Sequence, residues 1–153
     1  MTVVNNSVFS YIFWHSLLIK QNRHHKYGVL LHTFKVTLAV IKAKDYKFIA
    51  SALLHDIAKP FVAYIDEKKE DGYGYSFTDH EEKSYLIIKN WFFLSDWTKD
   101  IVRYHYIIRD ISKCKDKKNL IRLERLEQSW AILDEEFIAY LHTFLKYDDF
   151  GKS

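Results

Sequence analysis

The chain contains one proline and four glycines among 153 residues, and this scarcity of turn-forming residues constrains its fold more than any other feature. Glycine and proline mark most tight turns, and β-rich folds need such turns at short intervals. The alternation of apolar and polar residues that indicates a half-buried strand is nowhere sustained. An all-α fold is therefore predicted.

Helical periodicity of apolar residues appears in about six segments. Asp45 and Ser95 stand where N-caps are expected, and Pro60 prevents clean continuation of the third helix. A briefly extended run, "YGYSF" (73–77), lies inside the long loop from residue 61 to 78. The predicted helices are 4–20, 28–42, 45–58, a fourth that begins near 79, 95–111 and 118–146.

A chain of this length, with 48% hydrophobic and 17% aromatic residues, is expected to form one compact bundle over residues 1–153. The first helix (4–20) is expected to pack on the core, and the functional motifs fall within 24–149. No apolar run free of polar interruptions reaches the roughly 18 residues that a membrane span needs. The start of the chain also lacks the pattern of a signal peptide. No membrane association is expected.

The formal charge of +3 and the pI near 8.8 are mild. They suit a phosphate-bearing substrate but fall short of the strong basic signature of nucleic-acid-binding proteins. Cys114 is the only cysteine, which excludes an internal disulfide and an all-cysteine zinc site. A reducing, cytoplasmic location is the expectation. Cys114 lies in the polar segment "SKCKDKK" (112–118), which predicts a surface thiol.

Side chains able to bind a metal recur at helix positions that can face a shared centre. In "ALLHDIAKP" (52–60), His55 and Asp56 close an apolar run, and burial of either one alone is costly unless it is paired or binds a metal. A mixed imidazole and carboxylate set suits Mn, Fe, Ni, Co or Zn. The candidate ligands are His32, His55, Asp56, His80, His105 and either Asp148 or Asp149. The remaining histidines are interpreted as surface or core residues.

The order of these residues resembles the HD-domain metal-dependent phosphohydrolase superfamily. The resemblance rests on "LLHT" (30–33), "ALLHDIAKP" (52–60), "FTDHEEKS" (77–84) and "IVRYH" (101–105). With "HHKYGVLLHTFKV" (24–36), the context is most similar to the HD domains found with bacterial tRNA nucleotidyltransferases and their stand-alone relatives. At the C-terminus, Asp148 of "LKYDDFGKS" has the D-x-x-G spacing of that superfamily and is preferred over Asp149.

The resemblance implies an HD-domain helical bundle that binds one or two divalent ions (Mn, Fe, Ni, Co, Zn or Mg). One ion would be held by His32, His55, Asp56 and the C-terminal aspartate, and Asp56 would bridge to a second ion held by His80 and His105. The implied activity is that of a phosphatase or phosphodiesterase. Its substrate would be a nucleotide or a 2′,3′-cyclic phosphate ester, hydrolysed through a metal-bound hydroxide.

Asp56 and Lys59 are the catalytic candidates. Lys59, three residues past Asp56, is expected to contact only the substrate phosphate, with a solvated lysine as the alternative. The aromatic loop residues either stack on a nucleobase or pack the loop against the body. The further substrate-binding candidates are Arg103, Lys83, Tyr73, Tyr75 and Phe77.

Two non-catalytic alternatives stay open. The first is an HD-fold regulatory or nucleotide-binding module that keeps the fold without catalysis. The second is an RNA-binding accessory module, suggested by the basic run "KCKDKKNLIR" (113–122), which is otherwise interpreted as a solvated helix start. The presence of every ligand type in the expected order favours the enzyme. The expected partner is a small phosphorylated substrate, a nucleotide above all, and the sequence does not indicate the oligomeric state.

Overall fold

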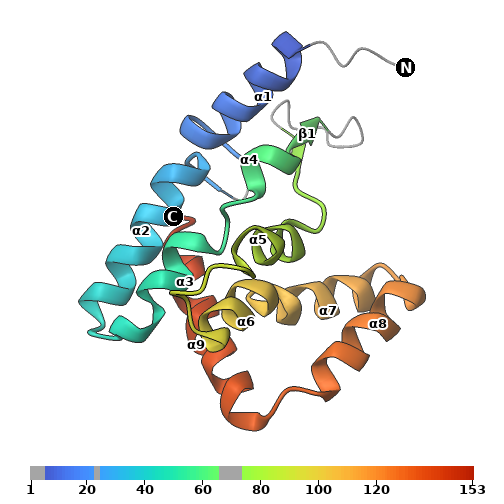
Figure 1. Ribbon diagram of the computed structural model, residues 1–153. Helices are drawn as coiled ribbons and strands as arrows, with labels where there is room; N and C mark the ends of the chain where they lie inside the picture. The colour runs from blue at the N-terminus through green and yellow to red at the C-terminus, as the bar shows by residue number, and fades with distance from the viewer. Residues whose placement is uncertain (1–5, 23–24, 66–73) are drawn as a thin grey trace.

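The computed structural model describes residues 6–22, 25–65 and 74–153 (Figure 1). Within these ranges the chain is almost entirely helical, and its only paired strands are the two-residue β1 (Tyr64–Ile65) and β2 (Tyr75–Ser76). The all-α prediction is confirmed. The helices are α1 (Asn6–Leu18), α2 (Val29–Lys42), the 3₁₀ turn η1 (Tyr46–Phe48), α3 (Ile49–Leu54), α4 (Lys59–Val62), α5 (His80–Ile88), α6 (Asp96–Tyr104), α7 (Ile107–Asp116), α8 (Leu120–Ala131) and α9 (Glu135–Phe150).

Three of the predicted helices, 45–58, 95–111 and 118–146, are each divided in the structure. The last divides into α8 and α9 because Asp134 caps a new helix, its Oδ1 accepting the backbone N–H of Phe137 at 2.7 Å. A cap of this kind competes with continued helical pairing, and the apolar periodicity on either side does not reveal it. The prediction of about six helices therefore underestimated the number of breaks.

The two predicted N-caps behave differently. The Ser95 hydroxyl accepts the backbone N–H of Thr98 at 3.1 Å and begins α6 as expected. Asp45 precedes η1 but makes no capping hydrogen bond. Its Oδ2 instead accepts the Tyr147 hydroxyl at 3.1 Å and so links the start of η1 to α9.

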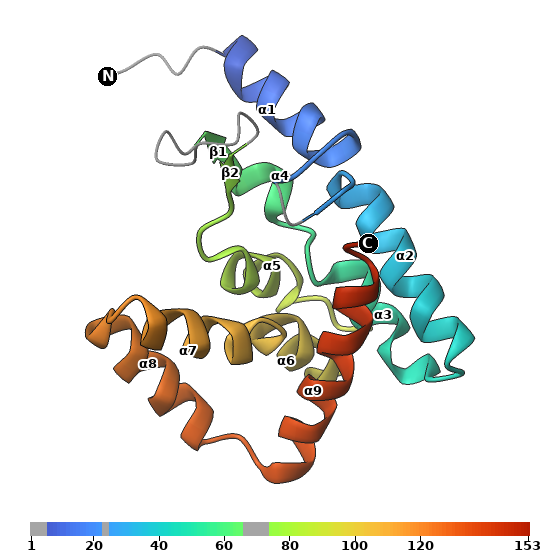
Figure 2. The same ribbon diagram turned by 180° about the vertical axis from the view of Figure 1, so that it is seen from behind.

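The central core is built where α2, α3, α6 and α9 meet (Figures 1 and 2). Figure 2 shows α9 lying beside α2 and α3, so the C-terminal end of the chain returns to the start of α2. The fully buried core residues are Val36, Val40, Phe48, Ala52, Ile101, Ile107, Leu141 and Phe144. Phe144 also touches the functional histidines, with ring centroids 5.6 Å from His55 and 6.2 Å from His105. The core therefore supports the site directly.

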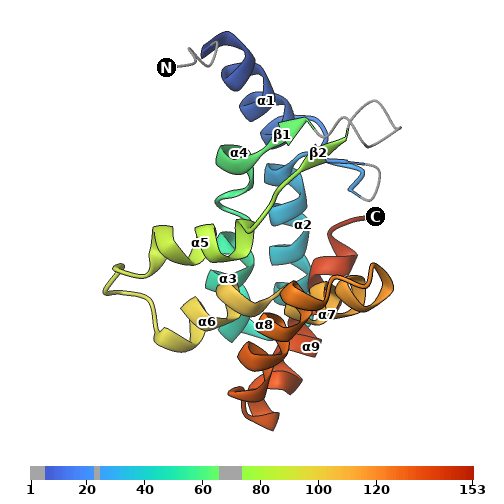
Figure 3. The same cartoon turned by 90° about the vertical axis from the view of Figure 1, so that its right-hand side faces the viewer.

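Two helix pairs complete the bundle. In Figure 3, α5 and α6 lie side by side and are joined by the loop of residues 89–95, and α7 packs against α8. The first predicted helix corresponds to α1, which contacts α2 and α4 and contributes no residue to the central core among the residues described. Tyr11 and Trp14 on α1 are more than half exposed, while His15 and Ser16 are buried. In the described part of the chain, no helix has the length and apolar character to cross a membrane.

Candidate metal centre

Six buried side chains from five separate parts of the chain converge beneath the surface. One comes from the middle of α2, two from the turn after α3, one from the start of α5, one from the residue after α6, and one from the last turn of α9. They are His32, His55, Asp56, His80, His105 and Asp148. These are the predicted ligand residues, and the structure brings all of them together.

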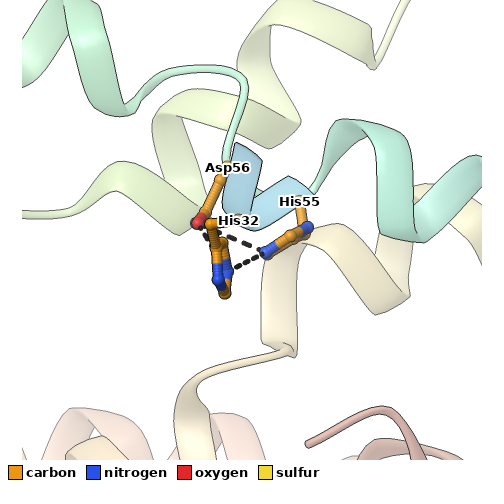
Figure 4. A group of neighbouring side chains, drawn as sticks. All are labelled: His32, His55 and Asp56. Atoms are coloured by element: carbon orange, nitrogen blue, oxygen red, sulfur yellow. Dashed lines mark hydrogen bonds and ion pairs between the residues drawn. The ribbon is translucent and has the colours of Figure 1, made fainter. Parts of the chain in front are cut away.

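The first half of the cluster surrounds His32. Its Nε2 atom lies 3.2 Å from Nε2 of His55, 3.0 Å from Oδ1 of Asp148 and 3.4 Å from Oδ2 of Asp56. Figure 4 shows the His32, His55 and Asp56 side chains turned toward one another. Their ligand atoms lie within 4.8 Å of each other, which one cation can span.

The second half uses the other oxygen of Asp56. Oδ1 of Asp56 lies 3.4 Å from Nε2 of His80 and 3.8 Å from Nε2 of His105. The ligand atoms of this group also lie within 4.8 Å of one another. Asp56 therefore belongs to two adjacent groups, with one carboxylate oxygen directed at each.

Backbone carbonyls orient three of the histidines. Nδ1 of His55, His80 and His105 lies 2.8, 2.9 and 2.7 Å, respectively, from the carbonyl oxygen three residues earlier. An Nδ1–H that donates there leaves Nε2 with a lone pair directed into the cluster. The carbonyl acceptors belong to Ala52, Phe77 and Val102.

Buried atoms of the cluster lack the partners that burial normally requires. Oδ2 of Asp56 pairs with the Lys59 ammonium at 2.7 Å, but among the described residues Oδ1 of Asp56 and Nε2 of His80, 3.4 Å apart, make no hydrogen bond. Buried polar atoms are almost always satisfied, and imidazole lone pairs beside a carboxylate are what borderline divalent cations bind. The residues present therefore fit one or two divalent metal ions.

Charge within the cluster shifts several pKa values. Burial opposes ionisation of Asp56, but His55 and Lys59 outweigh it and hold the pKa of Asp56 well below its usual range. Burial likewise opposes protonation of His55, yet the Asp56 and Asp148 carboxylates raise its pKa to about 9. Burial, assisted by His55, lowers the pKa of His105 to about 3. Without a metal, the two carboxylates therefore favour the protonated form of His55.

A family model, HD domain, matches residues 23–142, which is more than half of the chain. The chain belongs to the HD domain family. The match includes His32, His55, Asp56, His80 and His105, and Asp148 lies beyond it. The family is one of metal-dependent phosphohydrolases, in agreement with the donor set of the cluster. No curated protein and no solved structure matches the chain.

The structure separates the two C-terminal aspartates of this HD domain. Asp148 is 3% exposed and reaches His32. Asp149 points outward and pairs with Arg109 and with Lys152, whose Nζ lies 2.9 Å from Oδ1. The geometry therefore favours Asp148 over Asp149 as the sixth member of the cluster.

Gly151 gives the D-x-x-G spacing a structural reason. A Cβ atom at Gly151 would lie 2.8 Å from Nδ1 of His32 and 2.5 Å from Cγ2 of Val36. The backbone at Gly151 is in the ordinary helical region, so any residue could adopt it. Glycine is required because the chain passes directly against the His32 ring.

Lys59 differs from both sequence interpretations. It is only 5% exposed, so it is not a solvated lysine. Its Nζ lies 2.7 Å from Oδ2 of Asp56 and donates to Oε1 of Gln21 at 3.0 Å. The expectation that Lys59 touches only substrate is therefore wrong. Lys59 is the first residue of α4, three residues after Asp56. At this position its side chain turns toward Asp56, and the ammonium group reaches the carboxylate.

The connection between α1 and α2 contributes residues that the sequence interpretation missed. Gln21 is fully buried against Lys59. The buried His25 ring lies 5.2 Å from the His32 ring, and its Nδ1 is 3.1 Å from Oδ1 of Asn22. Burial, then the neighbouring Lys59 and His32, lowers the pKa of His25 to about 2. The available signal was the histidine pair directly before the helix that carries His32.

A cavity of about 330 Å³ opens beside His80 and Lys59. Tyr75, Phe77 and Tyr106 supply aromatic walls. Tyr75 is also buried, with its ring edge-on to His15 at a centroid distance of 5.5 Å, so it both lines the cavity and packs the loop. The Tyr73 candidate lies outside the described residues.

Two predicted substrate-binding residues, Arg103 and Lys83, do not line this cavity. Arg103 makes a bidentate pair with Glu82, at 2.8 and 3.2 Å, and its guanidinium lies 4.6 Å from the Tyr85 ring centre. It lines an adjoining hollow of about 160 Å³, which shares Asp79, Glu81, Asp110 and Arg122 with the cavity. Lys83 is exposed and lines neither space. Neighbouring positions on a helix face different directions, so closeness in sequence to the site histidines does not by itself bring a side chain into the cavity.

The basic run 113–122 is largely exposed, as predicted, but it is not the start of a single helix. It spans the end of α7 and the beginning of α8, which fold against each other. Lys113, Cys114, Lys117 and Arg122 from this run line the cavity. Cys114 is 6% exposed, so the prediction of a surface thiol is also wrong. Pairing of α7 with α8 buries it despite its polar sequence neighbours.

Proposed function

We propose that this HD domain is a divalent-metal-dependent phosphohydrolase that acts on a small phosphate ester, a nucleotide or a 2′,3′-cyclic phosphate. The observation that carries the proposal is the sharing of Asp56 between two adjacent histidine groups. Two cations side by side suit phosphoester hydrolysis because they stabilise both the attacking and the leaving oxygen. A protein that only binds nucleotides has no need of such a shared carboxylate.

The side chains have distinct roles in this proposal. Asp56 would bridge the two metal positions, with His32, His55 and Asp148 on one side and His80 and His105 on the other. When bound, divalent ions polarise a phosphoryl oxygen and lower the pKa of a water molecule toward about 7. Hydrogen bonds to buried backbone carbonyls hold the imidazole rings in fixed orientations. The rings therefore need little reorganisation when substrate binds.

Lys59 combines two contacts in the proposed reaction. Its ammonium group touches Asp56, and its side chain also forms part of the cavity wall. A phosphate group that enters the cavity beside His80 meets this positive charge before it reaches the cluster. Lys59 would therefore orient the phosphate and offset its negative charge in the transition state.

The cavity supports a substrate of nucleotide size. Its volume, about 330 Å³, lies at the lower end of the range of about 300 to 1,000 Å³ found for small-molecule sites. The aromatic rings of Phe77 and Tyr106 can pack against a base or sugar. The motif similarity to tRNA nucleotidyltransferase HD domains makes 2′,3′-cyclic nucleotides an early choice of substrate to test.

Elemental analysis of the purified protein, followed by a substrate screen, tests the proposal. Chelated protein is reloaded with Mn, Ni, Co or Mg and assayed with nucleoside monophosphates, 2′,3′-cyclic nucleotides, cyclic dinucleotides and aryl phosphates. Asp56→Ala should lose metal and activity together, whereas the matched control Asp149→Ala should keep both, because Asp149 points outward. If the metal-loaded protein hydrolyses none of these esters, the proposal of an enzyme is wrong, and the alternative of a non-catalytic HD module is supported.

A further inference from the structure

We infer that Lys113 and Lys117 form a second anion-binding subsite in the cavity, so that the preferred substrate is a nucleotide-sized phosphate ester carrying a second phosphate group. This inference rests on the proposed function, which would place the scissile phosphate at the metal centre. It assigns a role to the basic run 113–122, which the metal centre itself leaves unused.

The two lysines line the same cavity as Lys59 and His80. Lys59 and His80 both approach Asp56. The end of α7 and the turn that follows it supply Lys113 and Lys117, and Lys113 contacts Tyr106, whose ring packs on His80. A ligand that fills the cavity can therefore contact Lys59, Lys113 and Lys117, while the carboxylates in the lining lie beside other groups, Asp79 and Asp110 beside Arg122 and Glu81 beside His80.

Ion pairing leaves these two lysines available. Arg122, which lines the same cavity, is occupied, because it bonds to Asp110 at 2.9 Å and lies 3.4 Å from Asp79. No carboxylate among the described residues lies within 4.0 Å of the Lys113 or Lys117 ammonium groups. Like charges four residues apart on a helix repel each other, and a bound anion would relieve that repulsion.

Tyr106 fixes Lys113 relative to the metal centre. The Lys113 Nζ donates to the Tyr106 hydroxyl at 2.6 Å and lies 4.5 Å from the centre of its ring. That ring is 5.9 Å from the His80 ring and 6.2 Å from the His105 ring. One aromatic side chain thus separates the lysine from the cluster, a spacing that two phosphates on a single small molecule can bridge.

The volume of the cavity indicates the size of the ligand that carries the second phosphate. About 330 Å³ accommodates a single nucleotide. The inference therefore names a small bisphosphorylated ester, not an RNA end. Adenosine 3′,5′-bisphosphate is a suitable probe, compared with AMP, which lacks the second phosphate, and with a 5′-phosphorylated dinucleotide.

The first experiment measures KM for the three probes on the Mn-loaded protein, its Lys113→Gln/Lys117→Gln variant, and a Lys115→Gln control. Lys115 lies on the same helix but outside the cavity and is 3.6 Å from Glu127. The wild type and the control should show a KM roughly tenfold lower for the bisphosphate than for AMP, as charge-assisted contacts suggest. The double variant should lose this preference and keep its KM for AMP.

Other outcomes would overturn the inference. Equal KM values for AMP and the bisphosphate in the wild type would exclude the subsite, as would a double variant that retains the preference. A stronger preference for the dinucleotide than for the bisphosphate would exclude the small-substrate assignment. Both lysines are exposed, so loss of folding is not the expected effect of their substitution, and a thermal melt checks this.

Equilibrium binding separates failure of the subsite from failure of the proposed function. Metal-free protein should bind adenosine 3′,5′-bisphosphate with an affinity that falls roughly tenfold in the double variant and that declines with added salt. If no ester is hydrolysed but this lysine-dependent binding is observed, the proposed subsite is supported and the proposed phosphohydrolase activity is contradicted. If AMP is hydrolysed but the affinity for the bisphosphate is the same in the double variant, the proposed activity is supported and the proposed subsite is contradicted.

Discussion

The Nε2 atoms of His32 and His55 face each other at 3.2 Å in the centre of the cluster. Because Nδ1 of His55 lies 2.8 Å from the Ala52 carbonyl and donates to it, two unprotonated Nε2 atoms would oppose their lone pairs. A proton or a cation must therefore lie between them. The carboxylates of Asp56 and Asp148 raise the pKa of His55 to about 9, so the metal-free protein keeps a proton there at neutral pH.

Metal binding should therefore release a proton. Below pH 9 the ion must displace the proton from His55, so the apparent affinity for Mn²⁺ should rise by up to about tenfold per pH unit and level off above about pH 9. Calorimetric titrations at several pH values, in buffers of different ionisation enthalpy, measure both the affinity and the proton count. An affinity that does not change between about pH 6 and pH 8 would contradict this account of the His55 proton.

The same proton should make the metal-free protein more stable at low pH than at high pH over one defined range. The pKa of His55 is about 9 in the folded protein and 6.5 as its ordinary value, so protonation favours folding. That contribution is fully present below pH 6.5 and is lost as the pH rises through 9. Urea denaturation of chelated protein at about pH 7 and pH 9.5 should give a lower midpoint at the higher value, and the difference should be absent in His55→Gln.

Asp148 and Asp149 should respond very differently to the same substitution. Asp148→Asn removes a buried charge 3.0 Å from His32, and the affinity for Mn²⁺ should fall at least about tenfold. Asp149→Asn removes only outward pairs with Arg109 and Lys152, which are worth about 0 to 1 kcal/mol, and affinity should stay within about twofold. Metal titration of both variants makes the comparison. Equal losses would mean that the two aspartates share the role.

The sequence alone predicted the all-α fold and the set of residues that converges at the cluster. Burial cost was the informative quantity, because His55 and Asp56 end an apolar run and need a partner wherever that run is buried. The order of the other histidines and the resemblance to the HD-domain superfamily then indicated the rest of the ligand set. Identity and order of the ligands are local properties of the chain, and they could be read without knowing the packing.

What the sequence did not reveal depends on how helices pack. The positions of Lys59, Gln21 and His25 follow from the way α1, α4 and the turn before α2 meet, and residue spacing does not encode this. The direction of Arg103 depends on its pairing with Glu82 on a neighbouring helix. Residues 113–122 reach the cavity only because α7 folds against α8. Long-range packing decides each of these placements, whereas local pattern decides the ligand order.

Lys59→Met should separate turnover from metal binding. The ammonium group lies 2.7 Å from Asp56 and would repel a cation bound there. Removal of this positive charge lowers the repulsion, so metal binding should not weaken on electrostatic grounds. We expect metal content to be retained and kcat/KM to fall at least about tenfold, because the phosphate loses its charged contact. Gln21→Leu, which frees the lysine without removing it, should give a smaller loss. Metal loss in Lys59→Met would show that the lysine holds Asp56 in place for the metal.

Gly151→Ala tests whether close packing against His32 sets the geometry of the cluster. The backbone at Gly151 has φ −67°, so an alanine there is not strained by its conformation. Its Cβ, however, would lie 2.8 Å from Nδ1 of His32 and 2.5 Å from Val36, so the His32 ring or the end of α9 must move. Either movement separates His32 from Asp148, because the two residues lie on the two elements that are pushed apart.

We therefore expect the affinity of Gly151→Ala for Mn²⁺ to fall about tenfold or more, with a stability loss of about 1 to 3 kcal/mol from overpacking. Ser153→Ala, two residues further on, is exposed and offers a matched control that should leave affinity unchanged. Metal titration and urea denaturation of both variants, side by side, separate a local change at the cluster from general unfolding. Unchanged metal affinity in Gly151→Ala would mean that the C-terminal turn can shift without disturbing His32, and that Asp148 is held by α9 alone.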